Sequence, residues 1–258
     1  MNDPMFLAWA AFLGVVIGSF LNVCISRMPV GESVVKPRSR CPKCSEPVRW
    51  YDNIPIVSWF VLRGKCRFCK ESISWQYPAV EAATVVIWTV MALVYGPTAH
   101  GLVGAILLTI LLAIALTDAQ HYLIPDQLSI GGLAAGLALS FFPGPPTPLL
   151  SLAGAALGFS VLFAVGWLGE LVFKKPAMGG GDMKMMAMVG AFLGPLGSML
   201  TIFLGALAGS VIFGPISLKT GKLVPFGVFL AVGAAATFLF GDWLIDWYTG
   251  FLGAGGTL

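Results

Sequence analysis

The sequence predicts an all-α polytopic membrane protein, with about eight transmembrane helices and a small zinc-ribbon-like loop domain in the cytoplasm. The chain of 258 residues is 57% hydrophobic and only 10% charged, and its mean hydropathy is +0.88. An average soluble domain carries about a quarter charged residues. The apolar residues also gather in separate runs, and the basic residues and cysteines concentrate between two of these runs. Together these features exclude an ordinary soluble domain.

The apolar runs define the expected helices, because a transmembrane helix needs about 20 apolar residues. The first run, residues 5–26, follows Asp3 and precedes Arg27, whereas a secretory signal has a basic region before its apolar stretch. We therefore expect a retained span with its N-terminus outside. The eight expected spans are residues 5–26, 79–96, 101–117, 128–142, 149–173, 185–196, 198–216 and 223–241, of which the fourth and sixth are short.

The basic residues give the orientation, because Lys and Arg concentrate in short cytoplasmic loops. With the N-terminus outside, ten of the 15 basic residues fall in the inside loop 27–78, three in 174–184 and two, Lys219 and Lys222, in 217–222. The outer loops then carry none. Joining residues 185–216 into one span would place the last two lysines outside, so two spans are preferred.

The chain divides into a first transmembrane helix (1–26), a basic cytoplasmic segment (27–78) and a seven-helix membrane domain (79–258). The middle segment contains Cys41-Pro-Lys-Cys44 and Cys66-Arg-Phe-Cys69, with 21 residues between the pairs. Two such pairs are typical of a four-thiolate zinc site, which is structural because no coordination position stays open. The alternative is two disulfides, which require an oxidising compartment. The cytoplasmic placement favours zinc.

The basic residues of the same segment have two interpretations. A basic zinc ribbon is typical of nucleic-acid binding, but the charges also hold a loop in the cytoplasm and lie against anionic lipid. We favour the second interpretation and expect no nucleic-acid partner.

Two aspartates stand where apolar runs meet water. Asp118 closes the third expected span, and Asp182 precedes the sixth in the sequence MGGGDMK. The topology places both at the cytoplasmic face. An ionisable group near membrane depth is costly and usually functional, and two carboxyl groups that meet share a proton.

These motifs together resemble the bacterial type IV prepilin peptidases, membrane aspartic proteases with a Gly-x-Gly-Asp signature. The resemblance covers nearly the whole chain, although Cys24 and Ser26 replace an apolar residue and an aromatic that are common in the family. It rests on Gly18-Ser19-Phe20-Leu21-Asn22-Val23 with Arg27-Met28-Pro29, the cysteine pairs, Tyr77-Pro78 with Glu81, Thr117-Asp118 with Ile124-Pro125-Asp126, Gly179-Gly180-Gly181-Asp182-Met183-Lys184, and Pro225-Phe226-Gly227.

The resemblance implies a multi-pass enzyme of the bacterial inner membrane with its active site at the cytoplasmic face. Such enzymes cut the basic leader from prepilins or pseudopilins after a glycine, using an aspartate dyad. Many members then methylate the new N-terminal amine with S-adenosylmethionine. The expected catalytic residues are Asp118 and Asp182, the expected cofactors are zinc and S-adenosylmethionine, and the expected partners are prepilin substrates and the lipid bilayer.

Five further residues are expected to support the site. Gly179 and Gly181 let backbone and substrate approach closely and permit positive φ. Lys184 either acts electrostatically on Asp182 or marks the inner interface. Asp126 is interpreted as the N-cap of the fourth span in preference to a catalytic group. Glu81 either faces the substrate or methyl-donor site or forms a salt bridge with the basic loop.

Three other functions compete with this one. A proton-coupled transporter would use the aspartates as relay sites, but the sequences around them are not repeats of each other. A membrane-tethered zinc-ribbon adaptor leaves the Gly-x-Gly-Asp motif without a role. A peptidase that lacks methylation is the nearest alternative.

Overall fold

The structure is a computed structural model that describes residues 3–144, 146–175, 178–220 and 225–251, with side chains left out for 213–220. Lys222 of the predicted inner loop lies outside these residues. The chain forms two compact units, Met1–Ala105 and Ile106–Leu258, with α4 (Ala99–His121) running across the boundary. The predicted division at residue 79 follows polarity along the chain, whereas the compact units follow packing.

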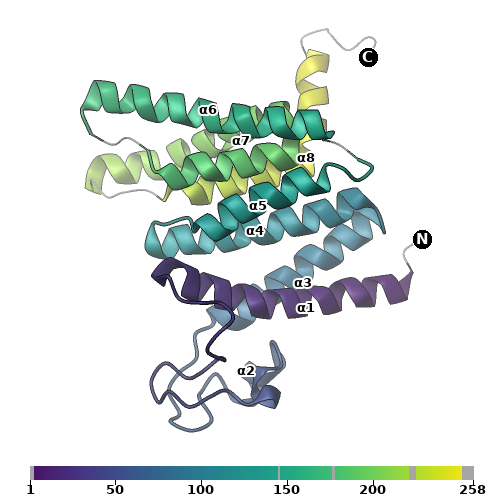
Figure 1. Cartoon of the computed structure of the whole chain (residues 1–258), viewed down its shortest axis with the longest axis vertical. Coiled ribbons are helices and arrows are strands. Elements are labelled where there is room, and N and C mark those ends of the chain that lie inside the picture. Colours follow the sequence, from purple (N-terminus) through teal and green to yellow (C-terminus); the bar gives the residue numbers. More distant parts are fainter. Residues whose placement is uncertain (1–2, 145, 176–177, 221–224, 252–258) are drawn as a thin grey trace. The chain divides into compact units, whose positions relative to one another are not determined.

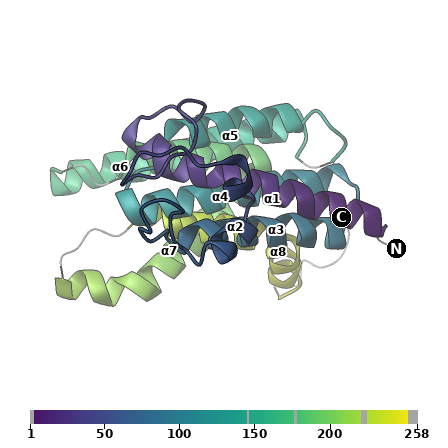
Figure 2. The ribbon, with the colours of Figure 1, turned by 90° about the horizontal axis from the view of Figure 1, so that it is seen from below.

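The first unit is built on the pair α1 (Pro4–Arg27) and α3 (Gln76–Tyr95), which lie side by side (Figure 1, Figure 2). Between them come the short helices η1 (Met28–Val30), η2 (Trp50–Asn53) and α2 (Val57–Val61). Asp3 starts α1 as its N-cap, because its carboxylate accepts the N–H of Met5 at 2.9 Å.

Small residues allow α1 and α3 to pack closely. A Cβ at Gly18 would lie 2.9 Å from the Cα of Glu81, so only glycine permits this approach of the backbones. One turn further along α1, Asn22 donates its side-chain N–H to the carbonyl of Tyr77 at 3.0 Å. Gly18 and Asn22 therefore help to hold the two helices close together.

The second unit contains the rest of α4, α5 (Asp126–Leu139), α6 (Pro148–Phe173), α7 (Gly180–Thr220) and α8 (Phe226–Phe251), with α7 packed against α5, α6 and α8. Gly154 of α6 and Gly190 of α7 meet backbone to backbone. Ser151 donates to the carbonyl of Ala191 at 2.7 Å. Such contacts are typical of helices that associate in a membrane.

The all-α membrane fold is confirmed: six helices among the described residues are long and apolar enough to cross a membrane. Three of the eight predicted segments do not appear as separate long helices. The fourth is α5, which has only 14 residues. The sixth and seventh are two halves of α7, joined at a kink where Gly194 has φ 71° and ψ −174°.

Candidate active site and metal centre

Asp118 lies near the end of α4 and is buried. Its Oδ2 accepts the backbone N–H of Val228 at 3.1 Å, and the N–H of Gly227 also points at this carboxylate. Both N–H groups belong to the first turn of α8, where backbone donors have no partner within the helix. The carboxylate therefore lies at the positive end of the α8 dipole, a favourable place for an anion.

Gly227 makes this approach possible. A Cβ at this position would lie 2.9 Å from Oδ2 of Asp118 and 2.8 Å from Cδ1 of Ile124. Pro225 precedes α8 and supplies no N–H of its own. The motif Pro225-Phe226-Gly227 thus starts a helix whose first free donors reach Asp118.

Asp182 is the third residue of α7, and its N–H donates to the carbonyl of Gly179 at 3.2 Å. The N–H of Gly179 points back at the Asp182 carboxylate. A Cβ at Gly181 would lie 3.1 Å from Cβ of Ile124. None of the glycines at 179–181 uses the positive φ that glycine permits, and the close approach expected of them is present at Gly181.

The two aspartates are brought together around Ile124. This buried side chain, in the link between α4 and α5, contacts both Gly181 beside Asp182 and Gly227 beside Asp118. Asp118 is also the charged neighbour that acts electrostatically on Asp182. The second unit therefore places two carboxyl groups, 64 positions apart in the chain, in one polar site at the ends of α4 and α7.

Lys184 and Asp126 form an ion pair beside this site, with Nζ at 2.7 and 2.9 Å from the two carboxylate oxygens. The interpretation of Asp126 as an N-cap was wrong. Pro125 is the cap residue of α5, and Asp126 is the first helical residue, without a capping hydrogen bond. Its carboxylate binds the lysine instead and so joins the start of α5 to the start of α7.

The four cysteines of the first unit also converge, with their sulfur atoms all within 4.8 Å of one another. The Sγ atoms of Cys41 and Cys69 are 3.7 Å apart, which equals the edge of about 3.8 Å in a tetrahedron with Zn–S bonds of about 2.3 Å. All four cysteines are free thiols, and this separation is far above the S–S bond length of about 2.05 Å. The donor set therefore fits a structural zinc ion and not two disulfides.

The two cysteine pairs share one backbone design. Cys41 donates its N–H to the carbonyl of Glu46, and Cys66, 25 residues later, does so to Glu71. Ser45 and Lys70, at matching positions, both have φ near 60°. In the first pair, the N–H groups of Cys44 and Lys43 lower the pKa of the Cys41 thiol to about 6. A thiolate is the form that binds metal.

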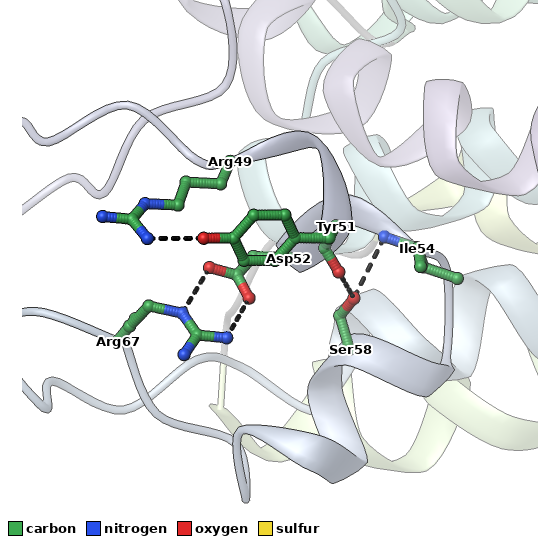
Figure 3. A network of polar contacts seen from close by, with 6 residues as sticks. All are labelled: Arg49, Tyr51, Asp52, Ile54, Ser58 and Arg67. Atoms are coloured by element: carbon green, nitrogen blue, oxygen red, sulfur yellow. Dashed lines mark hydrogen bonds and ion pairs between the residues drawn. The ribbon is translucent and has the colours of Figure 1, made fainter.

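A polar network fastens the second cysteine pair to η2 and α2 (Figure 3). Arg67 donates two N–H groups to the carboxylate oxygens of Asp52 at 2.7 and 2.5 Å. This hydrogen bonding lowers the pKa of Asp52. Ser58 of α2 donates to the carbonyl of Tyr51 and accepts the N–H of Ile54, both at 3.0 Å. The segment from 49 to 67 thus holds one conformation through side chains of its own.

For Glu81 the structure bears only on the expected salt bridge with the basic loop, whereas a contact with the substrate or methyl donor stays a prediction. Glu81 is buried in α3 and accepts the N–H of Ile56 at 2.6 Å, with Ser19 as a second hydrogen-bond partner. No salt bridge of Glu81 occurs within the described part of the chain. This carboxylate joins the loop to the α1–α3 pair.

Sequence reasoning missed the backbone donors of α8 and the role of Ile124. A backbone N–H has no residue signature, and only Pro225, at the expected start of a helix, could have indicated that free donors follow. Ile124 is part of a motif in the sequence, but its contacts depend on Gly181 and Gly227, which lie in two helices far apart along the chain.

Comparison with known proteins gives two matching family models. Residues 12–95 match the Bacterial Peptidase A24 N-terminal domain, and residues 105–214 match the Type IV leader peptidase family. The two matches divide at nearly the same place as the two compact units. No solved structure matches the chain.

Curated relatives match over nearly the whole chain. A prepilin leader peptidase/N-methyltransferase of Stutzerimonas stutzeri is 36% identical over 97% of this chain and 96% of its own length. One of the same name from Pseudomonas aeruginosa is 35% identical over 96% and 95%. A type 4 prepilin-like proteins leader peptide-processing enzyme of Escherichia coli is 34% identical over 87% and 90%.

Proposed function

The chain belongs to the type IV leader peptidase family, and we propose that it cleaves the leader of prepilins or pseudopilins with Asp118 and Asp182 as its catalytic dyad. The observation that carries this proposal is the convergence of the two carboxyl groups around Ile124 in one unit. A proton relay for transport has no comparable support, because relatives that match this chain over 96% and 95% of their own length are named prepilin leader peptidases.

Peptide hydrolysis needs a water made nucleophilic and a leaving amine protonated. Two neighbouring carboxyl groups do not both ionise easily, so the pair holds one proton between them. The ionised aspartate takes a proton from water as the oxygen attacks the scissile carbonyl, while the protonated one donates a hydrogen bond to that carbonyl oxygen. When the C–N bond breaks, the proton taken from water passes to the leaving amine. The N–H donors of α8 hold the Asp118 oxygens in place for this exchange.

The substrate enters with its cleavage point at the membrane boundary. Asp118 lies in the last turn of one span and Asp182 in the first turn of another, and the distribution of Lys and Arg puts these ends in the cytoplasm. A prepilin, which carries a basic leader before an apolar helix, presents its scissile bond at that depth. The enzyme then sits in the bacterial inner membrane, with its N-terminus outside, and cuts after a glycine.

The second proposed activity is methylation of the new N-terminal amine by S-adenosylmethionine. Its support is the name of the relatives, N-methyltransferase included. The cofactor would supply an electrophilic methyl group, and the amine freed by cleavage would be the acceptor. No described residue is assigned to the methyl donor.

Zinc has a structural role in this proposal. Cys41, Cys44, Cys66 and Cys69 would hold it and leave no position for water. The metal would close a loop of about 50 residues that has little apolar core of its own.

Purified enzyme in detergent tests the dyad with a prepilin, by mass spectrometry of the cleaved product. Asp118→Asn and Asp182→Asn should each lower the cleavage rate at least about 100-fold. Asp246→Asn is the matched control, since this exposed carboxyl lies 20 residues along α8 from Phe226, about 30 Å away at 1.5 Å per residue. Near wild-type cleavage by either dyad variant would refute the assignment.

A separate assay tests methylation. A leader-free pilin with a free N-terminal amine is incubated with radiolabelled S-adenosylmethionine and the Asp182→Asn variant. Label should enter the pilin, because this reaction does not use the dyad. If the wild-type enzyme transferred no label to the pilin, the protein would be a peptidase without methyltransferase activity.

A further inference from the structure

Apolar side chains of the loop form an exposed surface at the cytoplasmic end of α3. Val57, Phe60 and Val61 follow the spacing of one face of α2, and each is more than half exposed, as is Trp75. The Phe60 and Trp75 rings are 6.1 Å apart and nearly perpendicular. We call these four residues the interfacial patch.

The patch is held rigidly from behind. Trp59, on the opposite side of α2, donates its ring N–H to the carbonyl of Ile73 at 3.1 Å. Its ring packs against Trp75 at an angle of 44°, with ring centroids 4.0 Å apart. Gly64 allows this packing, since a Cβ there would lie 2.7 Å from the Trp59 ring. Ser58 fixes the other end of the helix through Tyr51 and Ile54 (Figure 3). The exposed face is therefore supported from behind by contacts within the loop.

The depth of the patch follows from Glu81. This residue is five positions into α3 and binds the N–H of Ile56, which directly precedes α2. Five residues span about 7.5 Å of helix, and the 20 residues of α3 span about 30 Å, the thickness of the hydrocarbon core. Helix α2 thus lies near the first turns of α3 (Figure 1). Because α3 has the length of a membrane span, this is the level where headgroups meet acyl chains. Trp75 directly precedes α3 in the sequence.

Charge distinguishes the possible occupants. Arg63 and Lys65 follow α2 directly, and the segment 27–78 carries ten basic and four acidic residues. The basic leader of a prepilin would be repelled here, whereas lipid phosphates would be attracted. Aromatic residues beside Lys and Arg are also the composition of membrane interfaces.

We propose that the interfacial patch inserts into the cytoplasmic leaflet beside α3, with Arg63 and Lys65 on anionic lipid headgroups, and so seats the four-cysteine loop on the membrane. Its occupant is the acyl–headgroup boundary of the bilayer. The proposal concerns the first unit alone and does not depend on the dyad or on methylation.

Photocrosslinking of the full chain in nanodiscs tests this. Phe60 is replaced by the photoreactive analogue p-benzoylphenylalanine, in discs of phosphatidylcholine with or without phosphatidylglycerol, and lipid adducts are measured by mass spectrometry. The matched control is the same replacement at Phe68, another exposed phenylalanine of the loop, which lies 5.3 Å from the Arg49 guanidinium. We expect at least about fivefold more lipid adduct at position 60 than at 68.

Variants that remove positive charge test the contact with lipid headgroups. Arg63→Gln with Lys65→Gln should lower the adduct yield at position 60 at least about threefold in discs with phosphatidylglycerol, and not in phosphatidylcholine alone. Lys36→Gln with Arg38→Gln removes the same charge from the loop and should change little. Equal adducts at 60 and 68, or crosslinks from 60 mainly to protein or to added prepilin, would overturn the proposal. Retained zinc in each variant shows that the loop is folded.

Discussion

The hydrogen bonds of the Asp118 carboxylate depend on Gly227, a residue without a side chain. The N–H groups of α8 reach this carboxylate only because Gly227 leaves room between Asp118 and Ile124. At the scale of single residues, the site thus depends on the absence of a Cβ at position 227 as much as on its two carboxyl groups.

Gly227→Ala tests this. The new Cβ would displace the Asp118 carboxylate or Ile124, and we expect cleavage to fall about 10- to 100-fold, since small misplacements of catalytic groups are costly. The protein should still accumulate in the membrane. Gly131→Ala, with nothing near its Cβ position, is the control in the same assay of prepilin cleavage. Wild-type activity in Gly227→Ala would show that the close approach has no catalytic value.

The pair Lys184–Asp126 gives a second prediction. Both side chains are partly exposed, Lys184 at 41% and Asp126 at 57%, so their ion pair contributes at most about 1 kcal/mol to stability. The role of the ion pair is to position Asp182, because Lys184 follows that residue by two positions. Lys184→Gln and Asp126→Asn should each lower kcat of cleavage about 3- to 10-fold. The kcat of the double variant should be no lower than that of the less active single variant. Kinetics of all three against Lys175→Gln check this, and additive losses would mean that the residues act separately.

The acidic residues of the site could be predicted from the sequence, since Asp118 and Asp182 each interrupt an apolar run. Their partners could not. The donors at Gly227 and Val228 are backbone groups, and the Lys184–Asp126 pair joins residues 58 positions apart. Contacts of that kind depend on how helices pack, which no local pattern contains.

Among the elements, α7 shows how a local sequence signal marks a break. Two spans were expected around Gly194-Pro195, and α7 consists of two helices that meet there at the non-helical Gly194. Pro195 cannot supply the N–H that a continuous helix needs, so the sequence did indicate the break. It could not show how sharply the chain turns: Oγ of Ser198 lies 2.7 Å from the Cβ position at Gly190, so the second half of α7 folds back beside the first.

Gly194→Ala isolates the backbone cost of the kink. A Cβ there would meet no atom closer than 3.6 Å, so crowding is absent, but φ 71° with ψ −174° is a conformation open to glycine alone. We expect a loss of about 1 to 3 kcal/mol in unfolding free energy. Denaturation in detergent measures it, with Gly180→Ala as a control in open space. An unchanged midpoint would mean that the kink adapts without strain.

The four-cysteine loop shows the opposite case, in which a spacing alone predicted an arrangement in space. Cys66→Ser should remove the bound zinc and make residues 27–78 more sensitive to protease, because the metal closes the loop. Metal analysis and limited proteolysis of the purified protein measure both effects. Cys24→Ser is the control, since this fifth cysteine is buried in α1, away from the cluster. Full zinc content in Cys66→Ser would reject the site.

At the scale of the whole molecule, hydropathy predicted more of the fold than any motif did. The six long helices, the short α5 and the kink in α7 all fall on the predicted apolar runs. The division into two units could not be read in the same way. It follows from the packing of α3 on α1 through glycines at 14 and 18, which hydropathy does not record.

Orientation is the whole-molecule property on which the cytoplasmic site depends, and thiol labelling of intact cells tests it. Every Lys and Arg falls in loops predicted inside, so Thr147, in the link before α6, should lie outside and Lys174, just after α6, inside. Thr147→Cys should react with a membrane-impermeant maleimide in intact spheroplasts, whereas Lys174→Cys should react only after permeabilisation. Wild-type protein sets the background from the loop cysteines, which on this orientation are shielded from outside. The reverse pattern would place Asp118 and Asp182 at the outer face, where a prepilin still carrying its basic leader could not present its cleavage point.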